Sequence, residues 1–482
     1  MSAKQFLPEA TPVSTFSKLR AQIELQTIIR RDSQKTPVVS GLSLRSNFAW
    51  VLAGNLVYAA CQWGMIVALA KLGSSYMVGQ FSLGLAIATP VLMFTNLHLR
   101  AVQATDARRL YTFAEYLRLR SVMTLVAIAV IAGVAGFEHY ERQTRMVVLA
   151  VALAKGIETL SDIHYGLFQL NDRLDKTGLS MMLRGVCSVA ALSAGLYLTR
   201  EIFWACVALV LVWLASLVLF DLHQGRRFSA ISWQGVRSSN WTDWCQPELS
   251  GQGFQRQWNL MRLALPLGMV TTMASVNLNM PRYFIEARMG VHQLGVFSAL
   301  AYATVALTLV SDSLGHCAIP RMSRLYAGGQ LAEFRSVLFK VSGIGSALGL
   351  GGLVVAQVMG TRLLTIFYSP EYAAGSRVFV VLMLATAIHC VAGMLTSGIM
   401  SARCFWVQVP MCALVVASTA LACYRLVPTA GLMGGAEAMV IGAVVRVALA
   451  APILGYLLLV QATCVAGHPA RPTRIHEWDP SL

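Results

Sequence analysis

The chain of 482 residues is 56% hydrophobic and only 12% charged, with a mean hydropathy of +0.61. An ordinary soluble domain carries about 25% charged residues, so this composition excludes a soluble globular protein and predicts one embedded in lipid. The formal net charge of +16 does not indicate nucleic acid as a partner, because the Lys and Arg residues are spread over short segments between apolar runs. In a membrane protein this charge balance is typical of orientation signals and of contact with anionic phospholipid.

A helix needs roughly 20 apolar residues to cross the hydrocarbon of a bilayer. Twelve runs of that kind predict an all-α, polytopic membrane protein with about 12 transmembrane helices. In chain order the runs lie near 47–70, 77–98, 119–137, 146–168, 178–199, 202–222, 262–284, 294–317, 337–359, 376–401, 405–425 and 431–461. The first 42 residues lack the apolar core of a signal peptide, and we expect them to form a cytoplasmic tail.

The distribution of basic residues predicts how these helices are oriented. With the N-terminus in the cytoplasm, most Arg and Lys residues fall on the inner side, and the outer loops, such as "TREI", are short. The positive-inside rule therefore places both termini in the cytoplasm. The expected organisation is an N-terminal tail (1–42), an N-lobe with helices 1–6 (43–223), a cytoplasmic linker (224–261), a C-lobe with helices 7–12 (262–461) and a C-terminal tail (462–482).

The sequence offers no pattern typical of a metal centre, a cofactor site or a covalent catalytic centre. Most of the ten cysteines sit inside apolar runs, and no C-x-x-C or Cys/His cluster has metal-ligand spacing. We therefore expect buried cysteines that act as small hydrophobic side chains, with no disulfide framework, no metal and no cofactor. The short outer loops are too small to cover a catalytic site, so the chain is not expected to be an enzyme.

Two polar connectors of the chain are similar in sequence. "RLYTFAEYLRLRSV" begins at Arg109 and "RLYAGGQLAEFRSV" begins at Arg324, 215 positions later, and each precedes the third helix of its half. The motif G-x-F-S also occurs at 79–82 and again at 295–298, an offset of 216. The chain therefore consists of two pseudo-symmetric six-helix lobes, related by a pseudo-two-fold axis along the membrane normal.

Three segments carry a resemblance to a known family: "LAKLGSSYMVGQFSLGLAI", "YGLFQLNDRLDKTGLSMMLRG" and "LNMPRYFIEARMGVHQLGVFSALAY". They are similar to the polysaccharide transporter (Wzx-like) flippases of the multidrug/oligosaccharidyl-lipid/polysaccharide exporter superfamily. The resemblance implies alternating access and export of a polyprenyl-diphosphate-linked oligosaccharide across the bacterial inner membrane, for surface polysaccharides such as lipopolysaccharide. Beside this lipid-linked oligosaccharide, it implies polysaccharide-assembly proteins as partners.

Two other functions remain open at this point. A drug/cation antiporter of the same superfamily would share the duplicated helices, but it would be expected to carry a carboxylate early in the first half. The run at 47–70 has none. A membrane polymerase or ligase of surface glycans would place its catalytic groups on a sizeable outer loop, and the sequence has no loop of that size.

The densest group of ionisable residues lies in the fourth predicted helix, "ALAKGIETLSDIHYG". Charged side chains at membrane depth are costly and usually face a cavity or a partner. Lys155, Glu158 and Asp162 are spaced i, i+3 and i+7, so they share one helical face. This face is either a cavity wall, with Lys155 on phosphate or sugar and a carboxylate carrying a coupling ion, or it holds a structural Lys155–Glu158 ion pair.

The C-terminal half offers more isolated candidates. Asn279 and Arg282 lie beside Pro281 in the seventh predicted helix, and Arg282 either grips a diphosphate with its planar donors or snorkels and pairs with Glu286. Further candidates, given with their expected roles, are Asp312 and His316 (gate, proton relay or a satisfied pair) and Arg446 (cavity wall).

Overall fold

The protein is helical throughout the residues that its structure describes. The computed structural model describes residues 42–106, 111–138, 140–232, 251–402 and 405–467, and these residues contain no β-strand. The first half holds α2 (Leu44–Leu72), α3 (Ser75–Asn96), α4 (Leu99–Thr105), α5 (Phe113–Phe137), α6 (Arg142–Leu170), α7 (Leu174–Thr199), α8 (Ile202–Ser216), the π-helix η1 (Leu217–Leu222) and α9 (His223–Ser232). The second half holds α11 (Gly251–Tyr302), α12 (Val305–Ala327), α13 (Leu331–Phe367), α14 (Pro370–Ala373), α15 (Ser376–Ser401), α16 (Phe405–Ala430) and α17 (Leu432–Gly467).

Most of these helices are suited to a lipid environment. Among the described residues, nine helices are long and apolar enough to cross a membrane, or up to ten if the bent pair formed by α11 and α12 is one span. α6 is not among the nine, and it carries Lys155 near its middle and Glu158 and Asp162 in its second half. It nevertheless packs between α3, α5 and α8. The predicted all-α, multi-pass membrane fold is confirmed.

Local sequence explains where α5 begins and where α11 breaks. The Thr112 hydroxyl accepts a hydrogen bond from the Glu115 backbone N–H, and the Glu115 carboxylate accepts one from the Thr112 N–H, a capping box that starts α5. Gly290 has φ 80° and ψ 175°, a conformation that glycine adopts far more readily than other residues, and it divides α11 into segments 251–289 and 291–302. The seventh predicted helix therefore ends at a glycine.

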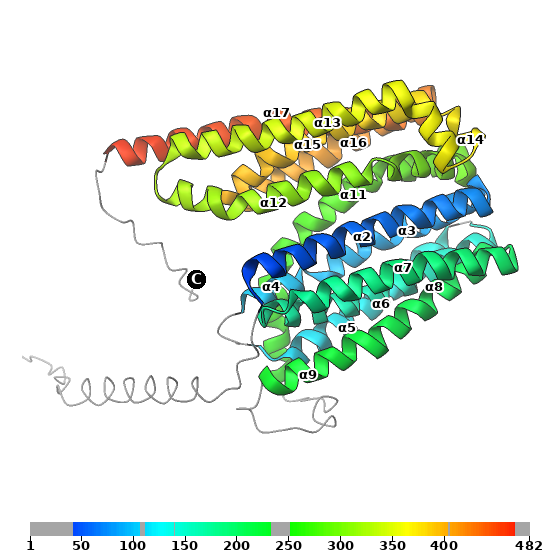
Figure 1. Ribbon diagram of the computed structural model, residues 1–482, viewed down its shortest axis with the longest axis horizontal. Helices are drawn as coiled ribbons and strands as arrows, with labels where there is room; N and C mark the ends of the chain where they lie inside the picture. The colour runs from blue at the N-terminus through cyan, green and yellow to red at the C-terminus, as the bar shows by residue number, and fades with distance from the viewer. Residues whose placement is uncertain (1–41, 107–110, 139, 233–250, 403–404, 468–482) are drawn as a thin grey trace, which may run out of the picture.

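The helices form two bundles that lie side by side (Figure 1). In the N-lobe (α2 to α9), α2 packs on α7 and α6 packs on α3, α5 and α8. In the C-lobe (the later part of α11 and α12 to α17), α15 packs on α12, α13 and α17, and α16 packs on α17. The two predicted six-helix lobes are thus observed.

The connections of both lobes sort to two ends of the molecule. One end, at α14 in Figure 1, holds the breaks at 73–74, 200–201 and 368–369, and we call it the short-loop end. The other end, at α4 and α9, holds the breaks at 97–98, 171–173 and 328–330, and we call it the basic end.

The lobes meet backbone to backbone at the repeated G-x-F-S motifs. A Cβ atom on Gly79 would lie 1.9 Å from the Val291 carbonyl oxygen, and one on Gly295 would lie 1.8 Å from the Ser75 carbonyl oxygen. Both distances are far inside van der Waals contact, so only glycine fits at either position. Because Ser75 and Gly79 match Val291 and Gly295 at the offset of 216, the pseudo-two-fold axis passes between α3 and segment 291–302.

Helix α11 belongs to both lobes. At the basic end, Arg256 lies 2.5 Å from the Glu115 carboxylate, and Leu260 and Ala264 are buried in one apolar cluster with Phe113. Beyond this contact α11 also packs against α16 and α17 of the C-lobe. The helix therefore crosses from the N-lobe to the C-lobe, as Figure 1 shows.

Polar side chains add a second contact between the lobes at the short-loop end. The indole N–H of Trp63 in α2 donates to the Tyr368 hydroxyl, at 2.9 Å. The Ser75 hydroxyl donates to the Glu371 carboxylate in α14, at 2.8 Å. Together with the glycine crossing, these bonds hold the two lobes together at this end.

Candidate functional site

The middle of α6 places an ion pair inside the N-lobe. Lys155 Nζ lies 2.7 Å from Glu158 Oε2, with side-chain exposures of 21% and 25%. The Tyr58 hydroxyl of α2 donates a hydrogen bond to the same carboxylate. Lys155 also lies over the ring of Trp213 in α8, 5.2 Å from its centroid, where a cation–π attraction stabilises the ammonium. Lys155 therefore has two partners within the N-lobe, Glu158 and Trp213.

A small pocket adjoins Lys155. Its walls come from α2, α3, α6 and α8, and its lining residues are Gln62, Met65, Phe81, Leu85, Val151, Ala154, Lys155, Leu209 and Trp213. Its volume of about 10 Å³ is roughly what a single water molecule needs. This conformation therefore has no room for a glycan beside Lys155.

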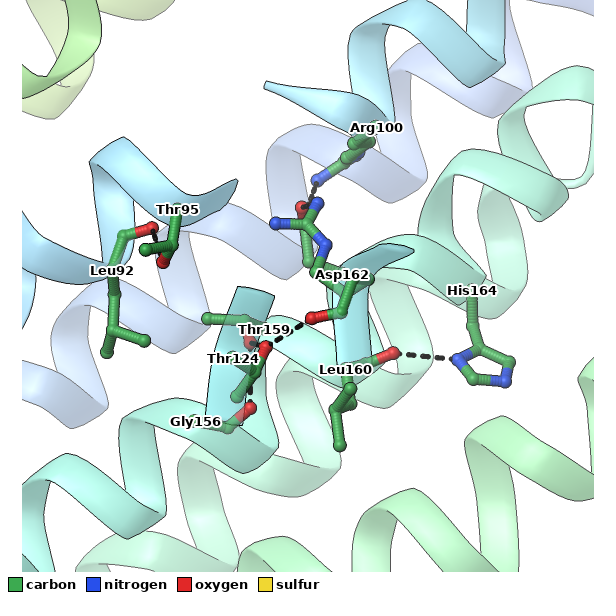
Figure 2. Close-up of polar contacts among 10 residues, drawn as sticks. Leu92, Thr95, Arg100, Thr124, Gly156, Thr159, Leu160, Asp162 and His164 are labelled. Atoms are coloured by element: carbon green, nitrogen blue, oxygen red, sulfur yellow. Dashed lines mark hydrogen bonds and ion pairs between the residues drawn. The ribbon is translucent and has the colours of Figure 1, made fainter. Parts of the chain in front are cut away.

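A second group of charges lies further along α6, toward the basic end (Figure 2). Asp162 accepts from Arg100 of α4 through Oδ1, at 3.1 Å, and from Arg120 of α5 through Oδ2, at 3.2 Å. We call these three residues the basic-end cluster. Asp162 and Arg100 are each 32% exposed, whereas the Arg120 side chain is only 1% exposed. One carboxylate thus serves two guanidinium groups.

A third group is completely enclosed. Arg184 of α7 lies 2.8 Å from Asp221 Oδ2, and their side chains are only 2% and 0% exposed. Arg184 also donates to the Ser161 hydroxyl, and Ser180 donates to the other Asp221 oxygen at 2.6 Å. We call these four residues the buried cluster. Its carboxylate is satisfied through both oxygens, which is the condition for a tolerable buried charge.

Asp221 reaches this cluster from an irregular turn. It lies in η1, a π-helical turn that follows α8, and such turns are frequent at functional sites. The extra residue of a π-turn rotates the side chains that follow it relative to a regular helix. The turn thus orients the carboxylate of Asp221 toward α7.

Sequence reasoning did not single out Arg100, Arg120, Arg184 or Asp221. A signal was present for two of them, since Arg184 interrupts the apolar run at 178–199 and Asp221 lies at the end of the run at 202–222. An ionisable residue inside an apolar run is a functional candidate by default. Arg100 and Arg120 lie at or beyond the edges of their apolar runs, where arginines are common and give no signal of function.

In the C-lobe half of α11, Arg282 is buried with a neutral partner. Its Nη1 donates to the Asn279 side-chain oxygen at 2.7 Å, and its guanidinium lies 5.2 Å from the centroid of the Tyr302 ring. Among the described residues it forms no ion pair with Glu286. The structure thus brings together the two predicted residues Asn279 and Arg282, and leaves the charge of Arg282 without a carboxylate.

The remaining candidates lie on α12 and α17. Asp312 faces α15, where a Cβ atom on Gly393 would lie 3.7 Å from its Oδ1. The side chain of His316 lies outside the described residues. Arg446 is half-buried, near enough to His389 of α15 to act on it electrostatically, and forms no ion pair within the described ranges. The structure does not join these residues to the N-lobe clusters.

No group of three or more His, Cys, Asp and Glu side chains that could hold a metal ion occurs among the described residues. In the N-lobe, Arg100, Arg120, Lys155 and Arg184 face three carboxylates, those of Glu158, Asp162 and Asp221. These three groups together therefore contain one more cation than carboxylates.

The chain is similar in sequence to proteins of polysaccharide biosynthesis and export, although no protein-family model matches it. It is 23% identical over 339 residues to the capsular polysaccharide biosynthesis protein CapF of Staphylococcus aureus, covering 70% of this chain and 80% of CapF. It is 30% identical over 128 residues to the EPS I polysaccharide export inner membrane protein EpsE of Ralstonia solanacearum, covering 26% of this chain and 28% of EpsE.

The structure is similar to that of a eukaryotic MATE transporter, with a TM-score of 0.58 and 11% sequence identity over 87% of this chain and 98% of the other. At this identity the similarity shows the fold. The chain is therefore a multi-pass membrane protein with the two-lobed fold of MATE transporters.

Proposed function

We propose that the protein is a flippase that moves a polyprenyl-diphosphate-linked oligosaccharide from the inner to the outer leaflet of the bacterial inner membrane, for surface polysaccharide assembly. The observation that carries this proposal is the combination of a MATE-like transporter fold with sequence similarity to 80% of the length of CapF. No covalent chemistry is needed, because the cargo only moves from one leaflet to the other. In this proposal the protein acts as a transporter of the multidrug/oligosaccharidyl-lipid/polysaccharide exporter superfamily.

The charges of the lobes support an anionic cargo. A lipid diphosphate is attracted to guanidinium and ammonium groups that lie in a low-dielectric surrounding. Lys155 in the N-lobe, and Arg282 and Arg446 in the C-lobe, are the cations that we assign to the cargo, with Asn279 as a polar contact. Glu158 or Asp162 in the N-lobe, and Asp312 with His316 in the C-lobe, are the candidates for coupling-ion binding or gating.

The orientation proposed here places the basic end and both termini in the cytoplasm. Arg100, Arg173, Arg256 and Arg324 lie at this end, in agreement with the positive-inside rule. Arg262 lies over the Trp258 ring at 4.9 Å, an arrangement suited to the headgroup region of anionic phospholipid. Polysaccharide-assembly proteins are the further partners that we propose.

The first experiment is deletion of the gene in its native host, followed by extraction of polyprenyl-linked lipids. We expect loss of the surface glycan and accumulation of a diphosphate-linked oligosaccharide on the inner leaflet, and mass spectrometry of that lipid identifies the cargo. Complementation with the intact gene must restore the surface glycan. Unchanged lipid intermediates in the deletion strain would contradict the proposal.

The second candidate function is a drug/cation antiporter, favoured by the fold shared with MATE transporters. Helix α2 contains no carboxylate to bind a cationic drug or a coupling proton, which speaks against it. The deletion strain separates the two functions, because an antiporter predicts altered sensitivity to cationic drugs with normal surface glycan.

A further inference from the structure

The basic-end cluster places two guanidinium groups on a single carboxylate, whereas the buried cluster pairs one arginine with one carboxylate. Arg100 and Arg120 each use one N–H group on Asp162, and Arg120 Nε and Nη1 have no hydrogen-bond partner. A guanidinium has five N–H donors, and a buried donor without an acceptor costs free energy. Arg120 is therefore incompletely satisfied in the present structure, although it is almost fully buried.

The members of the basic-end cluster differ in exposure, because Arg120 is almost fully buried. Asp162 and Arg100 are each about one-third exposed, and His98 beside them is exposed at the break between α3 and α4. Asp162 lies eight residues before the end of α6, which corresponds to about 12 Å along the helix from its basic end. An anion arriving at the basic end therefore meets Asp162 and Arg100 first and Arg120 behind them.

The geometry points to a phosphate-binding site, and we propose that Arg100 and Arg120 bind a diphosphate group. In this proposal the Asp162 carboxylate competes with the diphosphate for the two guanidinium groups. The Asp162 carboxylate bridges the two guanidinium groups as a phosphate would, with one oxygen toward each arginine. A diphosphate offers more acceptor oxygens and more negative charge than one carboxylate, so it displaces Asp162 and satisfies the donors left open on Arg120.

The buried cluster supplies the internal contrast. Asp221 accepts from both Arg184 and Ser180, and Arg184 also donates to Ser161, which leaves its Nε without a partner. The Arg184–Asp221 pair is almost completely buried, so no anion from outside can reach that donor. The C-lobe supplies a second contrast, because Arg335 stands at the position of Arg120 in the repeated connector but is exposed, and it forms no ion pair among the described residues. Among the clusters that the described residues form, only the basic-end cluster combines a buried, under-satisfied arginine with a partly exposed carboxylate.

The identity of the diphosphate carrier rests on the proposed function, whereas the site itself rests on the geometry. A lipid-linked cargo and the headgroup of an anionic phospholipid both present phosphate to this end of the lobe. We assign the site to the diphosphate of the cargo. In that role the cluster is a first docking point at the basic end, ahead of Lys155, which lies about two turns deeper on α6.

The test is diphosphate binding to the full-length protein in nanodiscs of uncharged phosphatidylcholine, measured by calorimetry with inorganic pyrophosphate and with farnesyl diphosphate. We expect Arg100→Gln and Arg120→Gln each to weaken binding by about tenfold or more, the scale of one charge-assisted hydrogen bond. Asp162→Asn keeps the shape of the side chain but removes its charge, and we expect it to tighten binding by about tenfold. Arg335→Gln, the matched variant from the repeat, must leave the affinity unchanged.

The sign of the Asp162→Asn effect decides between the two roles of the cluster. A purely structural ion pair predicts weaker binding or none in all three variants, and that result would overturn the site. Unchanged affinity in Arg100→Gln would also overturn it. This variant is expected to fold, because the Arg100 side chain is partly exposed. Tighter binding of farnesyl diphosphate than of pyrophosphate supports the lipid-linked source. Loss of diphosphate binding in nanodiscs that contain phosphatidylglycerol reassigns the site to phospholipid headgroups and overturns the cargo assignment.

Failure of the site is distinguishable from failure of the proposed function. If the deletion strain accumulates lipid-linked oligosaccharide while the arginine variants bind diphosphate as the wild type does, the flippase function stands and this site does not. If diphosphate binding follows the expected pattern but the deletion leaves the lipids unchanged, the anion site stands and the flippase function does not.

Discussion

The two repeated connectors contain the same arginine in two different surroundings. Arg120 in α5 is buried against Asp162 of α6, whereas Arg335 in α13 is exposed and forms no ion pair among the described residues. The repeated glycines behave in the opposite way, because Gly79 and Gly295 make the same close contact, each with the other lobe. The duplication therefore preserves the backbone contact between the lobes, whereas the buried ion pair of Arg120 is not repeated at Arg335.

A difference of this kind has a physical origin. A close backbone crossing on a two-fold axis involves both copies of a position equally, so a change in either copy breaks it. An internal ion network needs carboxylates on a neighbouring helix, and α6 supplies Glu158 and Asp162. The helix at the corresponding place in the C-lobe, α15, has no carboxylate. An arginine facing α15 would be buried without a counter-ion, at a high cost.

The largest effect is expected where the N-lobe charges are fully enclosed. Asp221→Ala leaves Arg184 buried without a carboxylate, and we expect a loss of about 3–5 kcal/mol of stability. The melting temperature of the purified protein, followed by tryptophan fluorescence, measures this. Asp175→Ala removes a partly exposed pair with Arg173 in the same lobe, and its effect should stay below about 1 kcal/mol. Equal losses in the two variants would show that enclosure of the charges is unimportant.

The glycine crossing is the next most sensitive place. The Cβ atom of Gly295→Ala collides with the Ser75 carbonyl, and Gly79→Ala makes the equivalent collision with Val291. We expect each variant to lose about 1–3 kcal/mol of stability and to lose transport. Gly343→Ala, where nothing lies within 4 Å of the added atom, is the control. Transport is measured as surface glycan in the deletion strain that expresses each variant. Full export by Gly295→Ala would show that the close glycine contact between the lobes is not needed for transport.

The comparison of the two arginines is tested directly by Arg120→Leu and Arg335→Leu. Asp162 keeps Arg100 as its counter-ion in Arg120→Leu, so we expect this variant to lose only about 1–2 kcal/mol of unfolding free energy. For Arg335→Leu we expect a change of less than about 0.5 kcal/mol. Thermal melting of both proteins in the same detergent measures the difference. Indistinguishable melting temperatures would mean that the buried position of Arg120 carries no energetic consequence.

The smallest effects are expected for the cations assigned to the cargo. Lys155→Ala and Arg282→Ala should reduce glycan export by about tenfold, which corresponds to about 1.4 kcal/mol of lost interaction, without reducing insertion into the membrane. Immunoblotting of membrane fractions checks insertion, and quantification of surface glycan checks export. Normal export by both variants would assign the two residues to packing, through Glu158 and Trp213 for Lys155 and through Asn279 for Arg282.

The amino-acid sequence by itself determined the architecture of this protein. Apolar runs long enough for a bilayer predicted the helices, and the repeats at offsets of 215 and 216 predicted two lobes of equal topology. These features follow from sequence because the helical period and the transfer of apolar side chains into lipid act locally along the chain. The spacing of Lys155 and Glu158 by three residues likewise predicted that they can meet, and they do.

Only the tertiary structure decided which polar groups from different helices come together. Arg100, Arg120 and Asp162 come from α4, α5 and α6, and Arg184 meets Asp221 only across the π-helical turn of η1. The depth and rotation of each helix set these partners, and both depend on packing against the rest of the bundle. A local sequence pattern contains neither quantity, which is why the repeated arginines look alike in sequence and differ in the fold.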